Sequence, residues 1–506
     1  RGPVAAREEA AAAAGDAAEG RGARHALLTG LLAASVLVAW HGATSIAPAD
    51  GYDGAAHVQY AEHVRETGEL PVEEDTYEFA SPPAFHWLSV RGQELAGGVG
   101  DAVEKVSDGP SGPAGRVLWL ALLVAGTWLA FGPRRRLGVL LLGGAGTLLL
   151  LEVLVVSVAT EWRIGQAISV ASTAAILVLA WLLGREAWPG ETARPIAVAA
   201  LAAAMPVLSR MGAMFHPEPL FAALALAAVL VAVRAARREW PLRHAAALGL
   251  LLGLGALTRQ TTGIVVVALA VAVAVAARRR ALVFGAVVAG VLLLVAGPWW
   301  LHQYDRYGNP IQSNLEREGY LLAEGQPRSF YVSFPARDLV LHPFRPAFEN
   351  ELLPMIHADV WGDWFGGQHD LWKDPGGAAR FFVSTQSVLG LPASVLAVGA
   401  LFAFGVPALR RLLRGPPRGP DVVFATALLV AALSWTAFVV TLVRYPQAGG
   451  DPVKASYMLY LVPLFALALV RAGSALWRRR GLWRIAVGAW IALYAASFVG
   501  YLLTSW

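Results

Sequence analysis

The chain has 506 residues, of which 56% are hydrophobic and 15% are charged, and its mean hydropathy is +0.52. Soluble domains usually carry about 25% charged residues, so this composition excludes an ordinary soluble protein and predicts one embedded in a bilayer. The formal net charge is +5, but the basic residues form short clusters between apolar runs, which argues against nucleic-acid binding. The chain has no cysteine, which excludes disulfides, thiolate nucleophiles and cysteine metal sites.

Residues 1–24 are Ala, Gly, Glu and Arg in low complexity. We expect a disordered cytoplasmic tail there, because such a segment cannot bury enough apolar surface to fold. The following run, 26–46, is as long as a full membrane span and lacks a convincing small-residue cleavage site. It therefore favours a retained helix over a signal peptide.

Hydropathy predicts about thirteen membrane-spanning helices, because a helix needs roughly 20 apolar residues to cross ~30 Å of hydrocarbon. The expected fold class is an all-α polytopic membrane protein. The predicted spans are 26–46, 116–131, 137–159, 165–183, 194–209, 219–234, 243–257, 263–277, 281–299, 383–405, 421–442, 456–471 and 483–503.

Arginine clusters orient these spans, since they follow the second, sixth, eighth, tenth and twelfth of them. The positive-inside rule places every cluster in the cytoplasm if the N-terminus is cytoplasmic, and the C-terminus then lies outside. This threading predicts an N-terminal transmembrane region 25–299 with an outer loop 47–115, a large extracytoplasmic loop 300–382, and a C-terminal transmembrane region 383–506.

The first outer loop opens with two carboxylates, Asp50 and Asp53, beside glycines. A carboxylate at the water interface after a span can accept a proton from an acceptor hydroxyl. The same residues also fit an ordinary turn, which Asp favours next to Gly. Two carboxylates are too few ligands to predict a metal ion.

Two short exterior loops carry further polar residues. His216 and Glu218, held between prolines, suit a rigid polar site, and they equally fit a helix break with Pro219 in the first turn of the next helix. The other loop holds Arg259 and Gln260. A charge between spans is a functional candidate by default, and a guanidinium forks onto phosphate oxygens. The alternative is an arginine that snorkels to the interface.

The loop 300–382 contains Trp361 and Asp363 in a segment rich in aromatics and acids. Aromatic faces beside acids suit sugar rings, but an aromatic belt that anchors the loop at the bilayer surface explains them equally well. Near the end of the chain, Lys454 and Tyr457 flank the last exterior loop. Lys454 faces out, against the positive-inside bias, so it is a candidate phosphate ligand or an ordinary interface lysine.

Other patterns indicate packing or exclude chemistry. Gly249 and Gly253 form a small-residue pair that is typical of close helix packing in membranes. The sequence holds neither a nucleotide-binding P-loop nor an H-E-x-x-H zinc motif. We therefore expect no cofactor, while a divalent-cation requirement stays open.

Taken together and in order, several motifs resemble those of the GT-C superfamily of integral-membrane glycosyltransferases. The similar branch is the bacterial one related to protein mannosyltransferases and to the aminoarabinose transferase of lipid A. The resemblance covers most of residues 26–470. The segments that carry it are Asp53–His57, Gly68–Pro71, Tyr77–Pro83, Thr258–Thr261, Tyr304–Pro310, Trp361–Gly366 and Lys454–Pro463.

The chain departs from the family pattern in three places. Gly54 stands where an acid is common, which weakens any paired-acid or metal mechanism there. His216-Pro217-Glu218 replaces a usual Asn-Asn-Asp, and the hairpin 116–159 resembles an insertion that bears on the acceptor site.

The resemblance implies roles for individual residues. Asp53 would be the general base that deprotonates an acceptor hydroxyl, and Glu78 a second acid that orients acceptor or donor. Arg259 and Lys454 would stabilise the leaving lipid phosphate, where negative charge grows. His57 lies in the first motif and is a candidate for substrate binding. These assignments require Asp53, Glu78, Arg259 and Lys454 to line one outward cavity.

The implied function is an inverting glycosyltransferase at the outer face of the cytoplasmic membrane. It would move a sugar from a polyprenyl-phosphate donor to an envelope lipid, polysaccharide or protein. The expected partners are the lipid-linked donor and membrane lipids, and we expect a monomer. The rival hypothesis is a transporter or flippase of lipid-linked intermediates, but such proteins often show internal repeats and broken helices at mid-membrane. A structural or sensor membrane protein is a second rival.

Overall fold

The computed structural model describes residues 27–104, 161–314, 321–344, 351–362, 377–415, 419–447, 453–479 and 481–505, with the isolated positions 122, 125 and 137. Apart from an isolated β-bridge between Leu321 and Gln447, all regular structure in these residues is helical. The expected tail 1–24 lies outside the described residues. So do the expected spans 116–131 and 137–159, except for the three isolated positions.

Nearly all of the regular structure in the described residues belongs to the following helices. In chain order they are Leu27–Ser45, α2 (Gly54–Thr67), α3 (Ala84–Glu104), α6 (Arg163–Ala187), α7 (Ala193–Ala203), α8 (Pro206–Ala213), α9 (Glu218–Arg237), α10 (Leu242–Ala256), α11 (Thr262–Ala277), the 3₁₀ turn η1 (Arg278–Arg280), α12 (Ala281–Tyr307), α13 (Arg328–Val332), α14 (Ala336–Leu341), α15 (Leu352–Trp361), α16 (Gly377–Arg414), α17 (Gly419–Arg444), the 3₁₀ helix η4 (Ala455–Leu461), α18 (Val462–Arg478) and α19 (Leu482–Ser505).

Eight stretches of helix in the described part are long and apolar enough to cross a membrane, or up to nine if the bent pair α7 and α8 counts as one span. One of the eight, Thr262–Tyr307, divides at η1 into α11 and α12. The helix α10 is apolar but has only 15 residues. The all-α polytopic fold class is confirmed, whereas the number thirteen is not.

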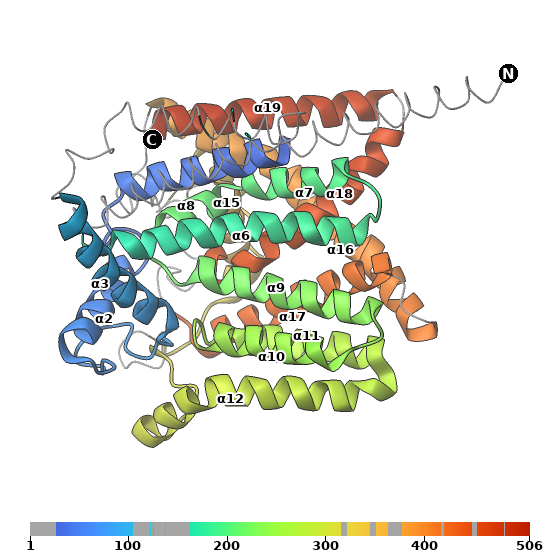
Figure 1. Cartoon of the computed structure of the whole chain (residues 1–506). Coiled ribbons are helices and arrows are strands. Elements are labelled where there is room, and N and C mark those ends of the chain that lie inside the picture. Colours follow the sequence, from blue (N-terminus) through green and yellow to red (C-terminus); the bar gives the residue numbers. More distant parts are fainter. Residues whose placement is uncertain are drawn as a thin grey trace.

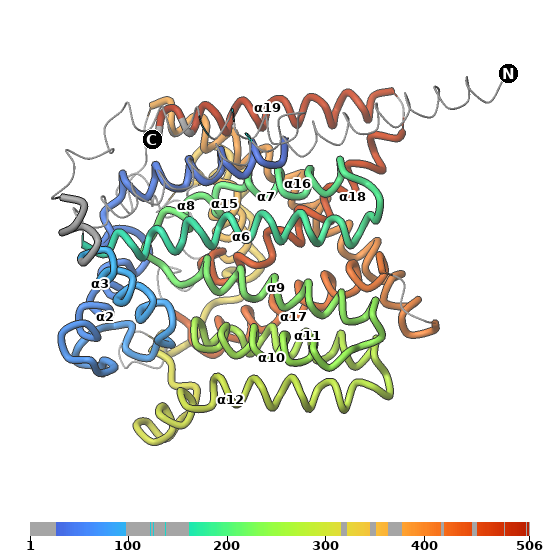
Figure 2. Tube along the Cα trace, viewed as in Figure 1, coloured from blue at the N-terminus to red at the C-terminus, as the bar shows by residue number. Residues whose placement is uncertain are grey.

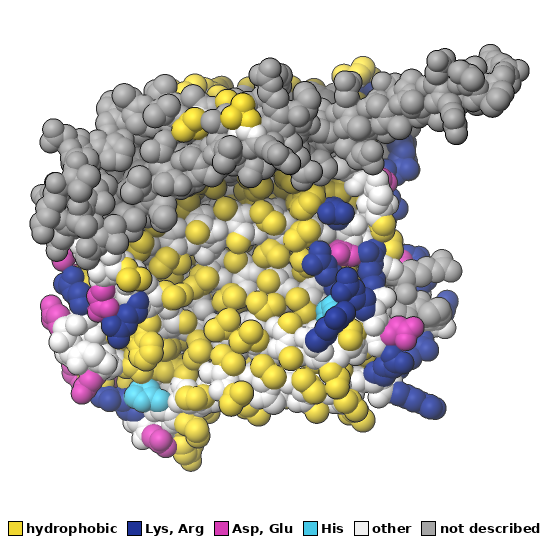
Figure 3. All heavy atoms as spheres, viewed as in Figure 1, with side chains coloured by type: hydrophobic (Ala, Val, Ile, Leu, Met, Phe, Trp, Pro, Cys, Tyr) yellow, Lys and Arg dark blue, Asp and Glu magenta, His cyan; other side chains and the backbone are white. Residues whose placement is uncertain are grey.

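The long helices run side by side, and α2 and α3 lie at one end of this bundle (Figure 1). The trace in Figure 2 follows the same arrangement, in which α6 packs on α9, α10 on α12, and α16 on α17. Hydrophobic side chains cover the middle of the face shown in Figure 3, and Lys and Arg gather mainly at the end away from α2 and α3. An apolar middle with charged ends is the distribution that a bilayer imposes.

Prolines explain the break between α7 and α9. Pro206 lies in the first turn of α8, which is bent by 61° from α7. Pro219 lies in the first turn of α9, which begins at Glu218. Proline has no N–H to donate inside a helix, but the first turn needs none. The predicted helix break at His216-Pro217-Glu218 is therefore present, and it leaves His216 and Pro217 on a short connector and Glu218 at the first position of α9.

The pair Gly249 and Gly253 lets α10 approach α12 closely. A Cβ at Gly249 would lie 2.6 Å from the carbonyl oxygen of Val288, and one at Gly253 would lie 2.7 Å from the Cβ of Val295. Neither position has room for a side chain without a shift of the backbone. The predicted packing role of the pair is confirmed.

We expect Gly249→Leu to destabilise the protein, because it forces apart the backbones of α10 and α12. Overpacking of this kind costs about 1–3 kcal/mol, and thermal unfolding in detergent should show a lower Tm. Gly290→Leu on α12 is the matched control, since a Cβ there meets nothing within 4 Å. Equal Tm values for the two variants would contradict the close packing.

Candidate functional site

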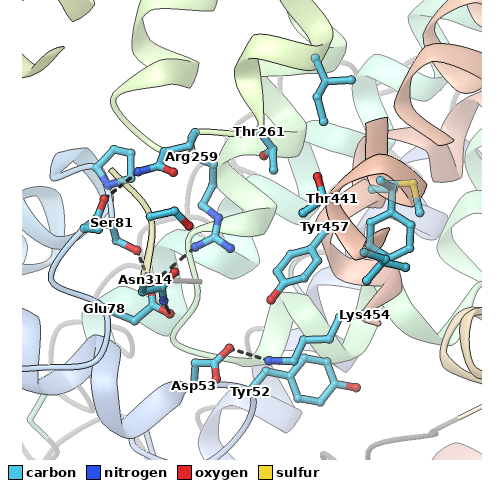
Figure 4. Close-up of a pocket in the computed structure, with 18 of the residues that line it drawn as sticks. Tyr52, Asp53, Glu78, Ser81, Arg259, Thr261, Asn314, Thr441, Lys454 and Tyr457 are labelled. Atoms are coloured by element: carbon cyan, nitrogen blue, oxygen red, sulfur yellow. Dashed lines mark hydrogen bonds and ion pairs between the residues drawn. The ribbon is translucent and has the colours of Figure 1, made fainter. Parts of the chain in front are cut away.

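A cavity of about 420 Å³ lies among the connectors at the end of the bundle where α2 and α3 lie. Its lining includes two carboxylates, Asp53 and Glu78, and two cations, Arg259 and Lys454. Figure 4 shows all four directed toward the same space from different ribbons. The structure therefore brings together the four residues that the family resemblance places in one cavity. Their chemical roles stay a prediction.

Asp53 is the N-cap residue of α2 and has left-handed backbone angles, φ 51° and ψ 16°. Asp is one of the few residues other than Gly that visit this region. The next residue must be Gly, because a Cβ at Gly54 would lie 2.9 Å from the carbonyl oxygen of Ala49. This close approach explains the departure at Gly54, since the turn that presents Asp53 has no room for a second acid beside it.

Asp53 forms an ion pair with Lys454, whose Nζ donates to its Oδ2 at 2.6 Å. Burial alone would raise the pKa of Asp53, but the adjacent ammonium brings that pKa below its usual value. Burial alone would likewise lower the pKa of Lys454, and the Asp53 carboxylate raises it above its usual value. Both groups are therefore charged at neutral pH, and each neutralises the other.

Arg259 lies between two carboxylates at the start of the α10–α11 connector. One terminal nitrogen is 2.5 Å from Glu218 Oε1 and the other is 3.8 Å from Glu78 Oε2. The guanidinium carbon is 5.6 Å from the ring centroid of Tyr457, and Lys454 Nζ is 6.0 Å from the same ring. The Tyr457 ring therefore stands beside both cations of the cavity (Figure 4), in the range of cation–π contact.

Glu78 is fixed by polar contacts from its own loop and from the segment after α12. Asn314 Nδ2 donates to its Oε1 at 3.2 Å, and the Ser81 hydroxyl donates to its other oxygen. Gln260 donates to the backbone carbonyl of Ala80 at 3.0 Å and to that of Gln312. Gln260 thus lines the cavity while its amide nitrogen holds two loops together.

His57 and His216 lie behind the cavity wall and are not part of its lining. His57 Nδ1 is 3.1 Å from His86 Nε2, the ring of His57 is 4.8 Å from that of His216, and His216 Nδ1 contacts Glu218. Burial lowers the pKa of His57, and lowers those of His86 and His216 well below the usual value. We therefore assign these rings as neutral groups that support Glu218 rather than as contacts to a substrate.

Two further candidates, Asp50 and Trp361, do not line the cavity. Asp50 is exposed and is not part of the lining. Trp361 is buried, donates to Ser394 Oγ at 2.8 Å and packs on Tyr494, so it anchors α15 to α16 and α19 instead of facing a sugar. Asp363 lies outside the described residues.

The cavity also holds residues that sequence reasoning did not select. Tyr77 stands inside one of the quoted motifs and Tyr52 directly precedes another, so their position was a usable signal, whereas nothing in the sequence singled out Asn314. An apolar wall comes from α11, α17 and η4. Its members are Ile264, Phe438, Leu442 and Met458.

Within the described ranges, the structure shows no group of three or more His, Asp or Glu side chains that could hold a metal ion. The cavity combines two carboxylates, two cations and several amide or hydroxyl groups next to an apolar wall.

Fold and cavity together define a polytopic helical membrane protein with a charged site at one end of its bundle. Residues 147–302 match the family model described as dolichyl-phosphate-mannose-protein mannosyltransferase. This match confirms the resemblance to GT-C membrane glycosyltransferases over that segment, which includes Arg259 and Glu218. No curated protein matches the chain significantly.

The chain also has a low similarity to solved structures, two of which follow. The crystal structure of ArnT from Cupriavidus metallidurans in the apo state has 16% sequence identity and a TM-score of 0.39, over 94% of this chain and 76% of that one. The crystal structure of the Archaeoglobus fulgidus oligosaccharyltransferase with a tethered acceptor peptide has 13% identity and a TM-score of 0.46. That match covers 94% of this chain and 55% of the archaeal one.

We expect Glu218→Gln to destabilise the protein, because it leaves the Arg259 guanidinium without its nearest buried counter-charge. Breaking a buried pair by removing one partner costs about 3–5 kcal/mol. Glu191→Gln removes one half of an ion pair with Arg194, whose side chains are 45% and 22% exposed, and such a pair is worth about 0–1 kcal/mol. Thermal unfolding should separate the two variants, and similar Tm values would contradict the buried role of Glu218.

Proposed function

We propose that this protein is a glycosyltransferase that moves a hexosyl or pentosyl group from a polyprenyl-phosphate donor to a hydroxyl of a cell-envelope lipid, polysaccharide or protein. The observation that carries the proposal is one cavity in which a partly exposed carboxylate, two cations and an apolar wall adjoin each other. A donor of this class has the matching parts, namely an isoprenoid chain, a phosphate and a sugar. The family description of residues 147–302, which names a lipid-phosphate mannose donor, supports the same class.

The proposed location is the cytoplasmic membrane, with the N-terminus in the cytoplasm and the cavity on the outer side. The cavity lies at the end of the bundle opposite most of the Lys and Arg seen in Figure 3, and the positive-inside rule assigns the basic end to the cytoplasm. In this orientation the loops 47–115 and 300–382 are extracytoplasmic, as the sequence predicts. The chain acts as a monomer on a donor that enters from the lipid.

In the proposed reaction, Asp53 accepts the proton of the acceptor hydroxyl. The acceptor oxygen then bonds to the anomeric carbon as the bond between that carbon and the phosphate oxygen breaks, and the configuration inverts. The leaving polyprenyl phosphate takes up the electron pair. Arg259 and Lys454 stabilise the charge that develops there, in a cavity where preorganised cations act more strongly than in water.

In this reaction the Asp53–Lys454 pair makes donor binding come before proton transfer to Asp53. Before the donor binds, Lys454 holds the pKa of Asp53 below its usual value, so the carboxylate is a weak base. A phosphate that attracts Lys454 removes this counter-charge, and the burial of Asp53 then raises its pKa. The base therefore gains strength when the donor is in place. Glu78, held by Asn314 at 3.2 Å, orients the sugar or the acceptor.

We expect Asp53→Asn to abolish transfer, because an amide cannot accept the proton. Removal of a general base costs about 10²–10⁴-fold. The measurement uses membranes and a radiolabelled mixture of polyprenyl-phosphate sugars, with Asp50→Asn as the control because Asp50 lies outside the cavity. Transfer that survives in Asp53→Asn would remove Asp53 as the base. Labelled lipid that crosses liposomes without sugar transfer would indicate a transporter instead.

We expect Lys454→Met to move the acid limb of the kcat/KM profile to higher pH. Lys454 is what lowers the pKa of Asp53, and without it burial, which raises that pKa, prevails. The deprotonated base then disappears at a higher pH than in the wild type. Loss of one cation from the phosphate should also reduce kcat by about 10²–10³-fold. Arg328→Met, at an exposed position outside the cavity, should change neither, and an unmoved acid limb in Lys454→Met would contradict the assignment.

A further inference from the structure

Asp359 on α15 is fully buried and is not part of the cavity lining. Both of its carboxylate oxygens have partners. Oδ1 accepts from the Tyr52 hydroxyl at 3.0 Å and from Arg210 at 3.0 Å, and Oδ2 accepts from the backbone N–H of Ala455 at 2.7 Å. With both oxygens bonded to groups from three different segments, the carboxylate can take up a single orientation.

Two of these partners are the chain neighbours of the ion pair in the cavity. Tyr52 precedes Asp53, and Ala455 follows Lys454. The side chains of Asp53 and Lys454 meet at 2.6 Å although 401 positions separate them in the sequence. One buried carboxylate therefore holds a chain neighbour of each member of the pair, Tyr52 through its hydroxyl and Ala455 through its backbone N–H.

Arg210 on α8 supplies the counter-charge that lets Asp359 remain buried. Its side chain is fully buried, and it donates to the Asp359 backbone oxygen at 2.5 Å as well as to Oδ1. A buried carboxylate needs both a counter-ion and hydrogen bonds to offset its loss of hydration. Arg210 supplies the counter-ion, and the Tyr52 hydroxyl and the Ala455 N–H supply much of the hydrogen bonding.

We propose that Asp359 is a positioning residue, which sets the distance between Asp53 and Lys454 by holding Tyr52 and the backbone of Ala455. It acts through these neighbours and does not touch the reacting groups. The inference rests on the proposed function for the roles of base and phosphate ligand. It goes beyond that function by making α15 a part of the site's construction. A buried ion pair that only stabilises the fold is the alternative, and the two are separable.

The main test variant is Tyr52→Phe. It removes the hydroxyl that reaches Asp359, but keeps the Arg210–Asp359 pair and the aromatic ring that lies 5.7 Å from Lys454 Nζ. Tyr494→Phe is the matched control, because it also removes one buried hydroxyl bond, of 2.8 Å to the carbonyl oxygen of Ala204, outside the cavity. The two variants lose the same chemical group, so a loss of packing alone affects them alike.

The first readout is amide hydrogen exchange of the purified protein, which needs no activity. We expect peptides covering residues 50–57 to exchange faster in Tyr52→Phe than in the wild type or in Tyr494→Phe. In Asp359→Asn we expect faster exchange both there and in residues 453–461. An asparagine has one acceptor oxygen in place of two, so it cannot serve Tyr52 and Ala455 together.

The second readout is the pH dependence of sugar transfer. When the Asp53–Lys454 pair is loosened, Lys454 lowers the pKa of Asp53 less than it does in the wild type. The charged and titratable groups that face Asp53 are Lys454, His57, Arg259, Tyr77 and Tyr457, and Tyr52→Phe alters none of them chemically. We expect its acid limb to move to higher pH, as in Lys454→Met, and its kcat to fall about 10- to 100-fold. Tyr494→Phe should keep the wild-type limb.

Two results would overturn the proposal. One is Tyr52→Phe that matches Tyr494→Phe in exchange and in pH profile. The other is Asp359→Asn that loses activity only in proportion to its loss of folded protein, with an unmoved acid limb and unchanged exchange at residues 453–461. Wild-type protein that transfers no sugar would defeat the proposed function instead, and the exchange measurement would still decide whether Asp359 holds the two segments.

Discussion

The obligation of buried charges to meet a partner shapes the site more than any other constraint. Three ion pairs stand close together at one end of the bundle, namely Asp53 with Lys454, Glu218 with Arg259, and Asp359 with Arg210. Each joins segments that are distant in the chain. An ionised group removed from water is costly unless its partner is in place, so these pairs tie the connectors to one another as firmly as packing ties the helices.

The three ion pairs differ in how accessible their side chains are to a ligand. Arg210 and Asp359 have side chains only 1% and 0% exposed, so neither is available to a ligand. Asp53 is 28% exposed and faces the cavity, which leaves it free to exchange Lys454 for another partner. Arg259, at 15% exposure, is intermediate, since Glu218 holds one side of its fork while the other side faces Glu78 across 3.8 Å. The exposed fraction of the side chain thus increases from the Arg210–Asp359 pair through Arg259 to Asp53. The least exposed charges support the structure, and the most exposed one is the proposed base.

Hydropathy was sufficient for the fold because spanning a bilayer requires long apolar runs, which are visible without any knowledge of contacts. The spans near α6, α9, α16, α17 and α19 were found for this reason. The hairpin 116–159 lies outside the described residues apart from the isolated positions 122, 125 and 137. The site was accessible from sequence only where polar residues interrupt the runs, as at Asp53, Arg259 and Lys454. Asp359 with Arg210 could not be found this way, because 149 positions separate the two and no local pattern records their pairing. Trp361 was a candidate sugar contact in the sequence, but it packs inside the bundle. A sequence does not distinguish an aromatic residue that packs inside a bundle from one that faces a sugar.

The arrangement also explains why an acid at position 54 would be a poor substitute for what the chain has. With Gly54 pressed against the Ala49 carbonyl, the turn can present one carboxylate, and that carboxylate is matched by one ammonium. A side chain at position 54 would have to displace the Ala49 carbonyl and would disturb the turn that carries Asp53. In the proposed mechanism, an arriving phosphate competes for Lys454, and the burial that makes an unpaired carboxylate costly then makes Asp53 more basic. Anion binding and the ability of Asp53 to accept a proton are linked there through one shared ammonium, so the mechanism depends on the distance between residues 53 and 454 as well as on the identity of each.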